Sequence, residues 1–419
     1  MHRLLLLLLP LGWLLPVAVR GQETTSVTGG TTAPDTTASP PVSSRRWQGE
    51  WSGQVALEAG WFYDEGYYPN QRNYAASVVM RPTYTLTASQ LGLKLTVRPF
   101  LRLDAADRSR SHADLRELYA SWSHRAWEVN AGVQAITWGN MLGPSLVNML
   151  NQTDEREDFT RFERLGQPVL DIARVGATHS LRLYVAPVFR PKQFPDERSR
   201  LYYFPLPIAT AQQTIAHRGW PALAARYTQR LGSLDVALSH FYGTNPAPVM
   251  YFNPQRFDLE PHYRTIHQTG LETQWITGNL TAKAEGTRRQ DGRTYWSYNT
   301  GLEYLFANLG GRNVDVLLAA EYLRDAWKLE NHYPFADMLF ATAQGTLGGL
   351  HTSQLSVRLL TNRKSWTPFL NVEATRHFGD HWQGDVEWTS FVGTRLPISD
   401  ALAVIQYNNS VRVAVRRYW

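Results

Sequence analysis

The sequence predicts an all-β protein, a transmembrane antiparallel β-barrel of about eighteen strands, from three observations. From residue 47 onward, segments of about ten residues alternate apolar and polar side chains. The connections between these segments are alternately short and long. After the N-terminus, no run reaches the ~20 consecutive apolar residues that a membrane-spanning helix requires.

Composition agrees with this fold and excludes several classes of function. The 419 residues carry a formal charge of +6, but the basic residues are spread along the chain and form no block, which argues against nucleic acid as a partner. The 15 Trp and 20 Tyr residues suit aromatic girdles at two membrane interfaces, although large lectins and glycosidases are also rich in aromatic residues. Because the chain has no Cys, disulfides, thiolate metal sites and Cys nucleophiles are excluded.

The N-terminal region is expected to lie outside the fold. Residues 1–21 combine a basic start with an apolar run and a small-residue cleavage site, so we interpret them as a cleaved signal peptide. A retained anchor is the alternative, but Pro10 and Pro16 interrupt the run. Residues 22–46 are almost all Thr, Ser, Pro, Gly and Ala, which predicts a disordered spacer or, alternatively, a glycosylated stalk. Residues 47–419 are then the outer-membrane barrel.

Several segments have the alternation of a barrel strand. The clearest is 91–104, where leucines form one row and Lys94, Arg98 and Arg102 the other. Pro99 falls in the apolar row and predicts a bulge or the edge of the membrane zone, since Pro is unfavourable inside a sheet. Segments 127–135, 181–190, 281–289, 313–323 and 353–361 alternate in the same way.

The lengths of the connections predict the topology. Short turns are expected at 89–90, 123–125, 179–180, 231–233, 278–279, 310–311, 350–352 and 379–380. Long loops are expected at 64–73, 138–168, 191–219, 244–262, 326–337 and 394–407. If every short turn is periplasmic and every long loop extracellular, both chain ends are periplasmic and the strand number is even, about eighteen. It would be sixteen if 169–178 and 338–348 were not strands.

The last strand, 409–419, places Val411, Val413 and Val415 on one face and Arg412 and Arg416 on the other. Ending on an aromatic residue, it resembles the C-terminal signature strand of bacterial outer-membrane barrels. The resemblance implies that the barrel-assembly machinery binds this strand and that it closes the barrel against the first. Arg417 falls in the lipid-facing row, so the strand must leave the hydrocarbon before it.

Charged side chains on the predicted inward rows are the candidate site. The lumen-lining candidates are Lys94, Arg98, Arg102, Glu117, Glu128, Arg182, Arg190, Arg226, Arg230, Lys283, Glu285, Arg358, Arg412 and Arg416. Arginine and lysine rings in a pore favour anions. The alternative is that acids and bases pair across neighbouring strands as a solvated ladder.

The loop 138–168 is long and carries a charged cluster. Long loops are usually functional or disordered, and a wide barrel can fold one inward. We therefore expect a constriction built from Asn151, Asp154, Arg156 and Asp158, with an ordinary surface loop as the alternative.

This region also resembles a recurrent block in porin-like outer-membrane barrels of the alginate-export type. A strand with a Gly-x-Gln pattern, Gly132 and Gln134, ends in Trp138-Gly139 and precedes a loop. In that loop Asn151, Asp154, Arg156 and Phe159 match in order, whereas Gln152 replaces the usual Pro and Val133 the usual Arg. The resemblance implies an outer-membrane channel with a charged lumen, and it does not fix the cargo.

Enzymatic and metal-dependent functions find little support, and we expect no cofactor. Ser239 and His240 are adjacent and would point to opposite faces of a strand. We therefore expect a channel for a polar or anionic solute, surrounded by outer-membrane lipid and lipopolysaccharide. The alternatives are a plugged barrel whose extracellular loops bind a partner or surface polysaccharide, and a secreted all-β enzyme acting on carbohydrate.

Overall fold

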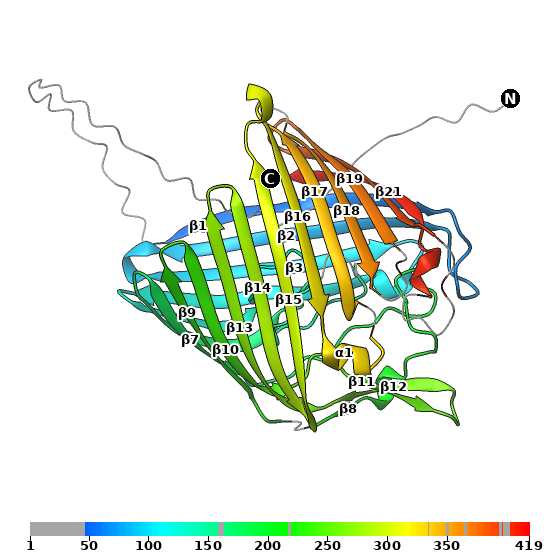
Figure 1. The fold of residues 1–419 in the computed structure, drawn as a ribbon, viewed down its shortest axis with the longest axis horizontal. Helices are drawn as coiled ribbons and strands as arrows, with labels where there is room; N and C mark the ends of the chain where they lie inside the picture. Colours follow the sequence, from blue (N-terminus) through cyan, green and yellow to red (C-terminus); the bar gives the residue numbers. More distant parts are fainter. Residues whose placement is uncertain are drawn as a thin grey trace, which may run out of the picture.

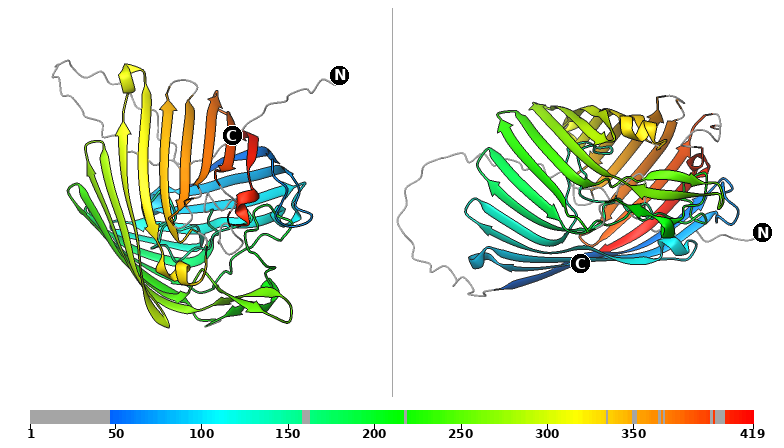
Figure 2. Two further views of the ribbon diagram at one scale, coloured as in Figure 1. Left: turned by 45° about the vertical axis from the view of Figure 1, so that its right-hand side comes forward. Right: turned by 90° about the horizontal axis from the view of Figure 1, so that it is seen from below.

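The protein is a closed β-barrel. The structure, a computed structural model, describes residues 47–157, 163–216, 219–333, 335–348, 352–363, 366, 368–393, 396 and 403–419. Within these residues, 18 strands form one antiparallel sheet that closes because β1 (Gln48–Phe62) pairs with both β2 (Tyr74–Ala88) and β21 (Ser410–Tyr418). The right view of Figure 2 follows the wall from blue β1 around to red β21. The predicted fold class and strand number are confirmed, and the predicted signal peptide and spacer lie outside the described residues.

Each barrel strand pairs with the barrel strands before and after it along the chain. The remaining barrel strands are β3 (Leu93–Asp104), β4 (His112–His124), β5 (Trp127–Gln134), β6 (Gln167–Val175), β7 (His179–Ala186), β9 (Ala222–Leu231), β10 (Leu234–Thr244), β13 (Thr265–Thr277), β14 (Leu280–Asp291), β15 (Arg293–Phe306), β16 (Val314–Arg324), β17 (Asp337–Leu347), β18 (Ser353–Asn362), β19 (Pro368–Phe378) and β20 (Trp382–Phe391). The two uncertain segments are therefore strands β6 and β17.

The alternation along the strands separates an apolar exterior from a polar lumen. On β3, Arg102 is 3% exposed while its neighbour Leu103 is 58% exposed, so the apolar side chain faces outward. Outward leucines and valines recur on the other strands, among them Leu57, Leu183, Leu271, Leu318 and Leu355. An apolar outer band around a polar interior is the surface of a transmembrane barrel.

Exposed aromatic side chains lie near both ends of the strands. Near the short turns they include Trp51, Trp122, Trp127, Trp275 and Trp382, and near the long loops Trp61, Tyr74, Trp296 and Trp388. Arg417 is exposed, and its guanidinium carbon lies 5.9 Å from the ring centroid of Trp382. The arginine in the outward row is therefore level with an aromatic ring near the turns, which agrees with the predicted end of the hydrocarbon zone.

Pro99 coincides with a β-bulge. The register between β3 and β4 shifts between Arg98 and Pro99, so that Arg98 pairs with Glu117 and Pro99 with Leu115. The extra residue on β4 is Arg116, which is buried, as is its neighbour Glu117. The bulge thus directs two consecutive charged side chains into the barrel.

The two ends of the barrel differ as predicted, with three corrections. The turn before β7 is 176–178, whereas we expected it at 179–180. Strand β7 ends at Ala186, so Phe189 and Arg190 lie outside the strand, contrary to the expected segment 181–190. At the end that carries the long loops, β14 and β15 are joined through Gly292 alone. The loop connections also contain structure of their own, namely α1 (Ala326–Glu330) and a sheet of β8 (Thr214–Ile215), β11 (Val249–Asn253) and β12 (Asp258–Tyr263), which Figure 1 shows gathered at that end.

Within the described residues, no helix is long and apolar enough to cross a membrane.

Candidate functional site: the lumen and its infolded segment

Between β5 and β6, residues 135–157 and 163–166 fold into the barrel, and we call them the infolded segment. Trp138, Val147, Leu150, Asn151 and Asp154 are all buried. The segment contacts inward-facing side chains on β2, β3, β13, β14 and β16, as described below. It therefore lies inside the lumen and not on the outer surface.

Carboxylates of the barrel wall hold the backbone of its first half. Glu321 accepts hydrogen bonds from the backbone N–H groups of Leu142, at 2.7 Å, and Gly143, at 2.9 Å. Glu285 accepts one from Leu146 at 2.8 Å, and Glu272 one from Gly139 at 3.1 Å. Glu272, Glu285 and Glu321 face inward from β13, β14 and β16, so they bind the segment where it crosses these strands.

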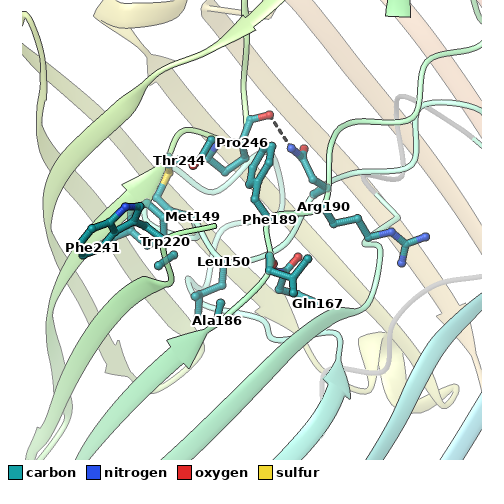
Figure 3. Close-up of a pocket in the computed structure, with 13 residues that line it drawn as sticks. Met149, Leu150, Gln167, Ala186, Phe189, Arg190, Trp220, Phe241, Thr244 and Pro246 are labelled. Carbon is teal, nitrogen blue, oxygen red and sulfur yellow. Dashed lines mark hydrogen bonds between the residues drawn. The ribbon is translucent and has the colours of Figure 1, made fainter. Parts of the chain in front are cut away.

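Apolar contacts hold its middle. Trp138, Val147, Met149 and Leu150 pack with inward side chains of the wall in one buried cluster that includes Phe241 and Ile266. Figure 3 shows Met149 and Leu150 beside Phe241, Ala186 and Trp220, around a small pocket. The amide of Gln152 donates to the carbonyl oxygen of Pro246 at 2.8 Å, the dashed line in Figure 3. The middle of the segment is thus buried against β7, β10 and β13.

Ion pairs hold its last part. Arg102 of β3 donates to Glu157 from Nε, at 3.0 Å, and from Nη2, at 2.8 Å, while its Nη1 donates to Glu58 of β1 at 2.6 Å. Arg81 donates to Glu163 at 3.0 Å, and Arg110 donates to the backbone carbonyl of Arg156 at 3.0 Å. Arg81 of β2, Arg102 of β3 and Arg110 of the turn after β3 therefore place basic side chains beside the acidic last part of the segment.

Asp154 and Asn151 lie at the centre of these contacts. Asp154 accepts hydrogen bonds from Arg116 at 2.9 Å and from Nε of Arg156 at 3.0 Å. Burial raises the pKa of Asp154, but hydrogen bonds from His112 and Arg156 and the charge of Arg116 outweigh burial and hold its pKa well below the ordinary range. Asn151 donates to the carbonyls of Gln134 and Leu165 and so ties the start of the segment to its end. Of the four constriction candidates, Asn151, Asp154 and Arg156 lie in the lumen and Asp158 lies outside the described residues.

Most of the predicted lumen bases contact carboxylates. Arg98 pairs with Glu117 at 3.1 Å, Arg226 with Glu272 at 2.8 Å, and Arg412 with Glu387 at 2.8 Å. The same holds for the pairs Arg182–Glu128, Arg190–Asp114, Lys283–Glu303 and Arg358–Glu373. Arg230 pairs with Asp235 beside the β9–β10 turn, Lys94 is exposed on β3, and Arg416 is buried. The pairs Arg98–Glu117, Lys283–Glu303, Arg358–Glu373 and Arg412–Glu387 join neighbouring strands, as the alternative to an anion-attracting ring predicted, whereas Arg182–Glu128, Arg190–Asp114 and Arg226–Glu272 do not.

Sequence reasoning missed several residues that hold the infolded segment. Glu58, Arg81, Arg110, Arg116, Glu157 and Glu163 were not among the candidates. The only signal for Arg116 was Pro99, because the bulge opposite that proline adds one inward residue to β4. Arg110 lies in a turn, where strand alternation gives no orientation.

The structure separates the two residues that the sequence raised as a catalytic pair. Ser239 is buried and its hydroxyl donates to the backbone carbonyl of Gly270, whereas His240 faces outward and contacts Thr269. Within the described residues, no group of three or more His, Asp or Glu side chains could hold a metal ion.

Comparisons with known proteins give structural neighbours but no family. No family model matches the chain, and no curated protein matches it. A triple mutant of the Rhodopseudomonas blastica porin has a TM-score of 0.43 and 11% sequence identity, covering 89% of this chain and 100% of that one. The outer-membrane channel DcaP of Acinetobacter baumannii has a TM-score of 0.46 and 11% identity, covering 90% of this chain and 99% of that one.

Proposed function

We propose that this protein is a bacterial outer-membrane channel through which small polar or anionic solutes pass passively. The observation that best supports this proposal is a closed wall with apolar outward rows and a polar lumen that one loop segment crosses. Such a wall satisfies its backbone hydrogen bonds internally and suits lipid outside and water inside. In this proposal outer-membrane lipid and lipopolysaccharide surround the barrel, and the assembly machinery binds β21.

The infolded segment is the proposed constriction. It is held from opposite sides of the barrel, by Glu272, Glu285 and Glu321 on one side and by Arg81 and Arg102 on the other. A segment fixed at both sides would narrow the path without moving. Since most lumen bases are paired with acids, we propose that any preference for anions over cations is weak.

The test is conductance of the purified full chain in a planar bilayer. We expect discrete conductance steps and, under a salt gradient, a reversal potential displaced slightly towards that of the anion. Swelling of liposomes that contain the protein, in neutral sugars of increasing size, would give the width of the path. A reversal potential of cation sign would contradict the anionic part of the proposal. Silent bilayers from folded, heat-modifiable protein would contradict the channel itself.

One observation favours the second candidate, a plugged barrel whose outer loops bind a partner or surface polysaccharide. Tyr202, Tyr203, Phe204 and Ile405 form a buried cluster with side chains from other loops, including Tyr68, Met250 and Leu259. These loops therefore pack on one another at the loop-bearing end of the barrel. The plugged barrel predicts no conductance and no sugar uptake, so the same experiment separates the two candidates.

A further inference from the structure

The outward face of β10, β13 and β14 carries polar side chains within the apolar outer band of the barrel. They are His240, His267, Thr269, Arg288 and Gln290, and we call them the outer polar patch. Thr269 lies directly opposite both His240 on β10 and Arg288 on β14, and the three strands are neighbours in the wall (Figure 1). Since directly opposite residues have Cβ atoms about 4.5–5.5 Å apart, Arg288, Thr269 and His240 form one continuous row.

The outer polar patch is basic and has no acid beside it. The outward rows of β9, β10, β13, β14 and β15, all of which the structure describes, contain no Asp or Glu. Arg288 makes no hydrogen bond or ion pair with any residue in the described part of the chain. By contrast Arg324, an outward arginine on β16, pairs with Asp337 at 3.0 Å. The charge of Arg288 is therefore available to an anion from outside the protein.

The position of Arg288 along β14 sets its depth in the membrane. It lies near the end of the strand that joins β15 through Gly292, and directly opposite Trp296, which is 67% exposed. Exposed Trp side chains are typical of the boundary between hydrocarbon and headgroups. An outward arginine costs much less free energy at this boundary than at the middle of the bilayer. The guanidinium group thus lies at the level of lipid headgroups.

The row offers hydrogen-bond donors that suit a phosphate. The guanidinium of Arg288 can donate two parallel hydrogen bonds to phosphate oxygens. Nδ1 of His240 and Oγ1 of Thr269 are 3.0 Å apart and share one hydrogen bond. If His240 donates that bond, the Thr269 hydroxyl proton is free, and if Thr269 donates it, the Nε2 proton of His240 is free. In either arrangement this pair adds one donor beside Arg288.

Small side chains lie next to Arg288 on the side of the bilayer centre. Gly286 and Ala284 follow it in the outward row of β14. Gly286 lies directly between Leu271 of β13 and Tyr298 of β15, whose side chains are 48% and 43% exposed. A Cβ at Gly286 would meet no atom within 4 Å. A hydrocarbon chain therefore has room between these two larger side chains, directly below the cation.

We propose that the outer polar patch binds the phosphate group of a membrane lipid. Arg288 and the Thr269–His240 pair donate to the phosphate, and an acyl chain of the same lipid lies over Gly286 and Ala284. The assignment of this lipid to the outer leaflet rests on the proposed function. The binding of a phosphorylated lipid does not.

The test is equilibrium binding of lipid to the purified full chain in detergent, measured by native mass spectrometry. The two probes are dioleoyl phosphatidic acid and dioleoylglycerol, which have the same acyl chains but differ in the phosphate. We expect a saturable complex with one phosphatidic acid, and binding of dioleoylglycerol about tenfold weaker because it lacks the charged acceptor. Equal affinity for the two lipids overturns the proposal.

Matched variants locate the site. Arg288→Gln should weaken the tightest binding of phosphatidic acid about tenfold. The control is Arg376→Gln on β19, which removes the same charge from an exposed outward arginine that lies opposite Ser353 and Gly384. It should leave the tightest binding unchanged. Equal effects of the two substitutions, or none from Arg288→Gln, contradict the assignment.

Heat-modifiable migration on gels shows whether each variant is folded. If Arg288→Gln does not fold, Thr269→Val replaces it, because valine suits a strand but removes the hydroxyl donor. Thr269→Val should also weaken the tightest binding of phosphatidic acid, and unchanged binding would contradict the site.

Two other occupants of this face give different results. Inorganic phosphate that displaces phosphatidic acid at equal concentration would show that the patch binds the free anion, which overturns the lipid as its ligand. A second copy of the chain on this face would give an oligomer that Arg288→Gln dissociates, without a complex with phosphatidic acid. That result also overturns the proposal.

Failure of this proposal is distinguishable from failure of the channel. Conductance without preference for the phosphorylated lipid removes the lipid site and leaves the channel. Preference for the phosphorylated lipid without conductance removes the channel and leaves the lipid site.

Discussion

Arg102 is the residue on which the ionic contacts of the infolded segment depend most. It is 3% exposed and bonds carboxylates from two separate parts of the chain, Glu58 and Glu157. A buried charge is costly unless it is paired and hydrogen-bonded, and removing one partner leaves the other uncompensated. Arg98, on the same strand, forms an ion pair with Glu117, but its side chain is 48% exposed and water screens the pair.

We expect Arg102→Met to lower the free energy of unfolding by about 3–5 kcal/mol, because two carboxylates lose their buried partner. Arg98→Met, its control, should change it by at most about 1 kcal/mol. Denaturant titration of the protein in lipid vesicles measures both. Equal losses for the two variants would show that burial of the pair does not set its contribution.

At the scale of elements, the path of the infolded segment depends on Gly139. Gly139 has φ +87°, and a Cβ there would lie 2.2 Å from Oε1 of Glu285 and 2.4 Å from Oγ of Ser145. Gly143, in the same segment, would place a Cβ 3.2 Å from Oε2 of Glu321, a flexible side-chain end that can move. Gly139 is therefore required by its left-handed backbone conformation, and Gly143 is not.

We expect Gly139→Ala to displace the first half of the segment and to increase single-channel conductance, whereas Gly143→Ala should conduct like the wild type. Single-channel recording measures both. If Gly139→Ala conducts like the wild type, the first half of the segment does not limit the path.

At the scale of elements, the sequence predicted strands well and loops poorly, for a physical reason. Alternation is imposed by lipid on one face and the lumen on the other, so each strand carries its own signal, as β3 does. Even the bulge had a local signal in Pro99. The path of the infolded segment had none, because Leu142 is held by Glu321, far away in the sequence.

The whole molecule depends on the seam between its first and last strands. Ala59 of β1 lies directly opposite Val413 of β21, whereas Val411 is opposite Trp61 and so diagonal to Ala59. Diagonal neighbours across an antiparallel pair are about 7–8 Å apart, too far for an unstrained disulfide. The chain has no Cys of its own, so the seam can be tested with introduced pairs.

We expect the double variant Ala59→Cys with Val413→Cys to form a disulfide on mild oxidation, because the two residues face each other. The control, Ala59→Cys with Val411→Cys, should form it poorly. After heat denaturation, non-reducing gels separate the cross-linked chain from the linear one. Equal cross-linking in the two variants would mean that the register of the seam is not the one described.

For the whole molecule, the predicted barrel and its even strand number were correct. Each barrel strand pairs with the next barrel strand along the chain, so counting the connections also counts the strands. The single-residue connection at Gly292 was missed, since its length breaks the contrast between short turns and long loops. The small sheet of β8, β11 and β12 was missed because its strands are short and pair across two different loops. Ion pairing in the lumen was left open because alternation gives the facing of a side chain but not its partner.

The hydrogen bonds from the infolded segment to Glu272, Glu285 and Glu321 also bear on how such a protein could change over time. In the segment, these carboxylates bind backbone N–H groups, which every residue except proline supplies, and Glu285 also accepts a hydrogen bond from the Ser145 hydroxyl. Positions between the bound groups, such as Asn140 and Met141, could therefore be exchanged without moving the segment. The wall would keep the crossing in place while substitution alters the surface that a passing molecule meets.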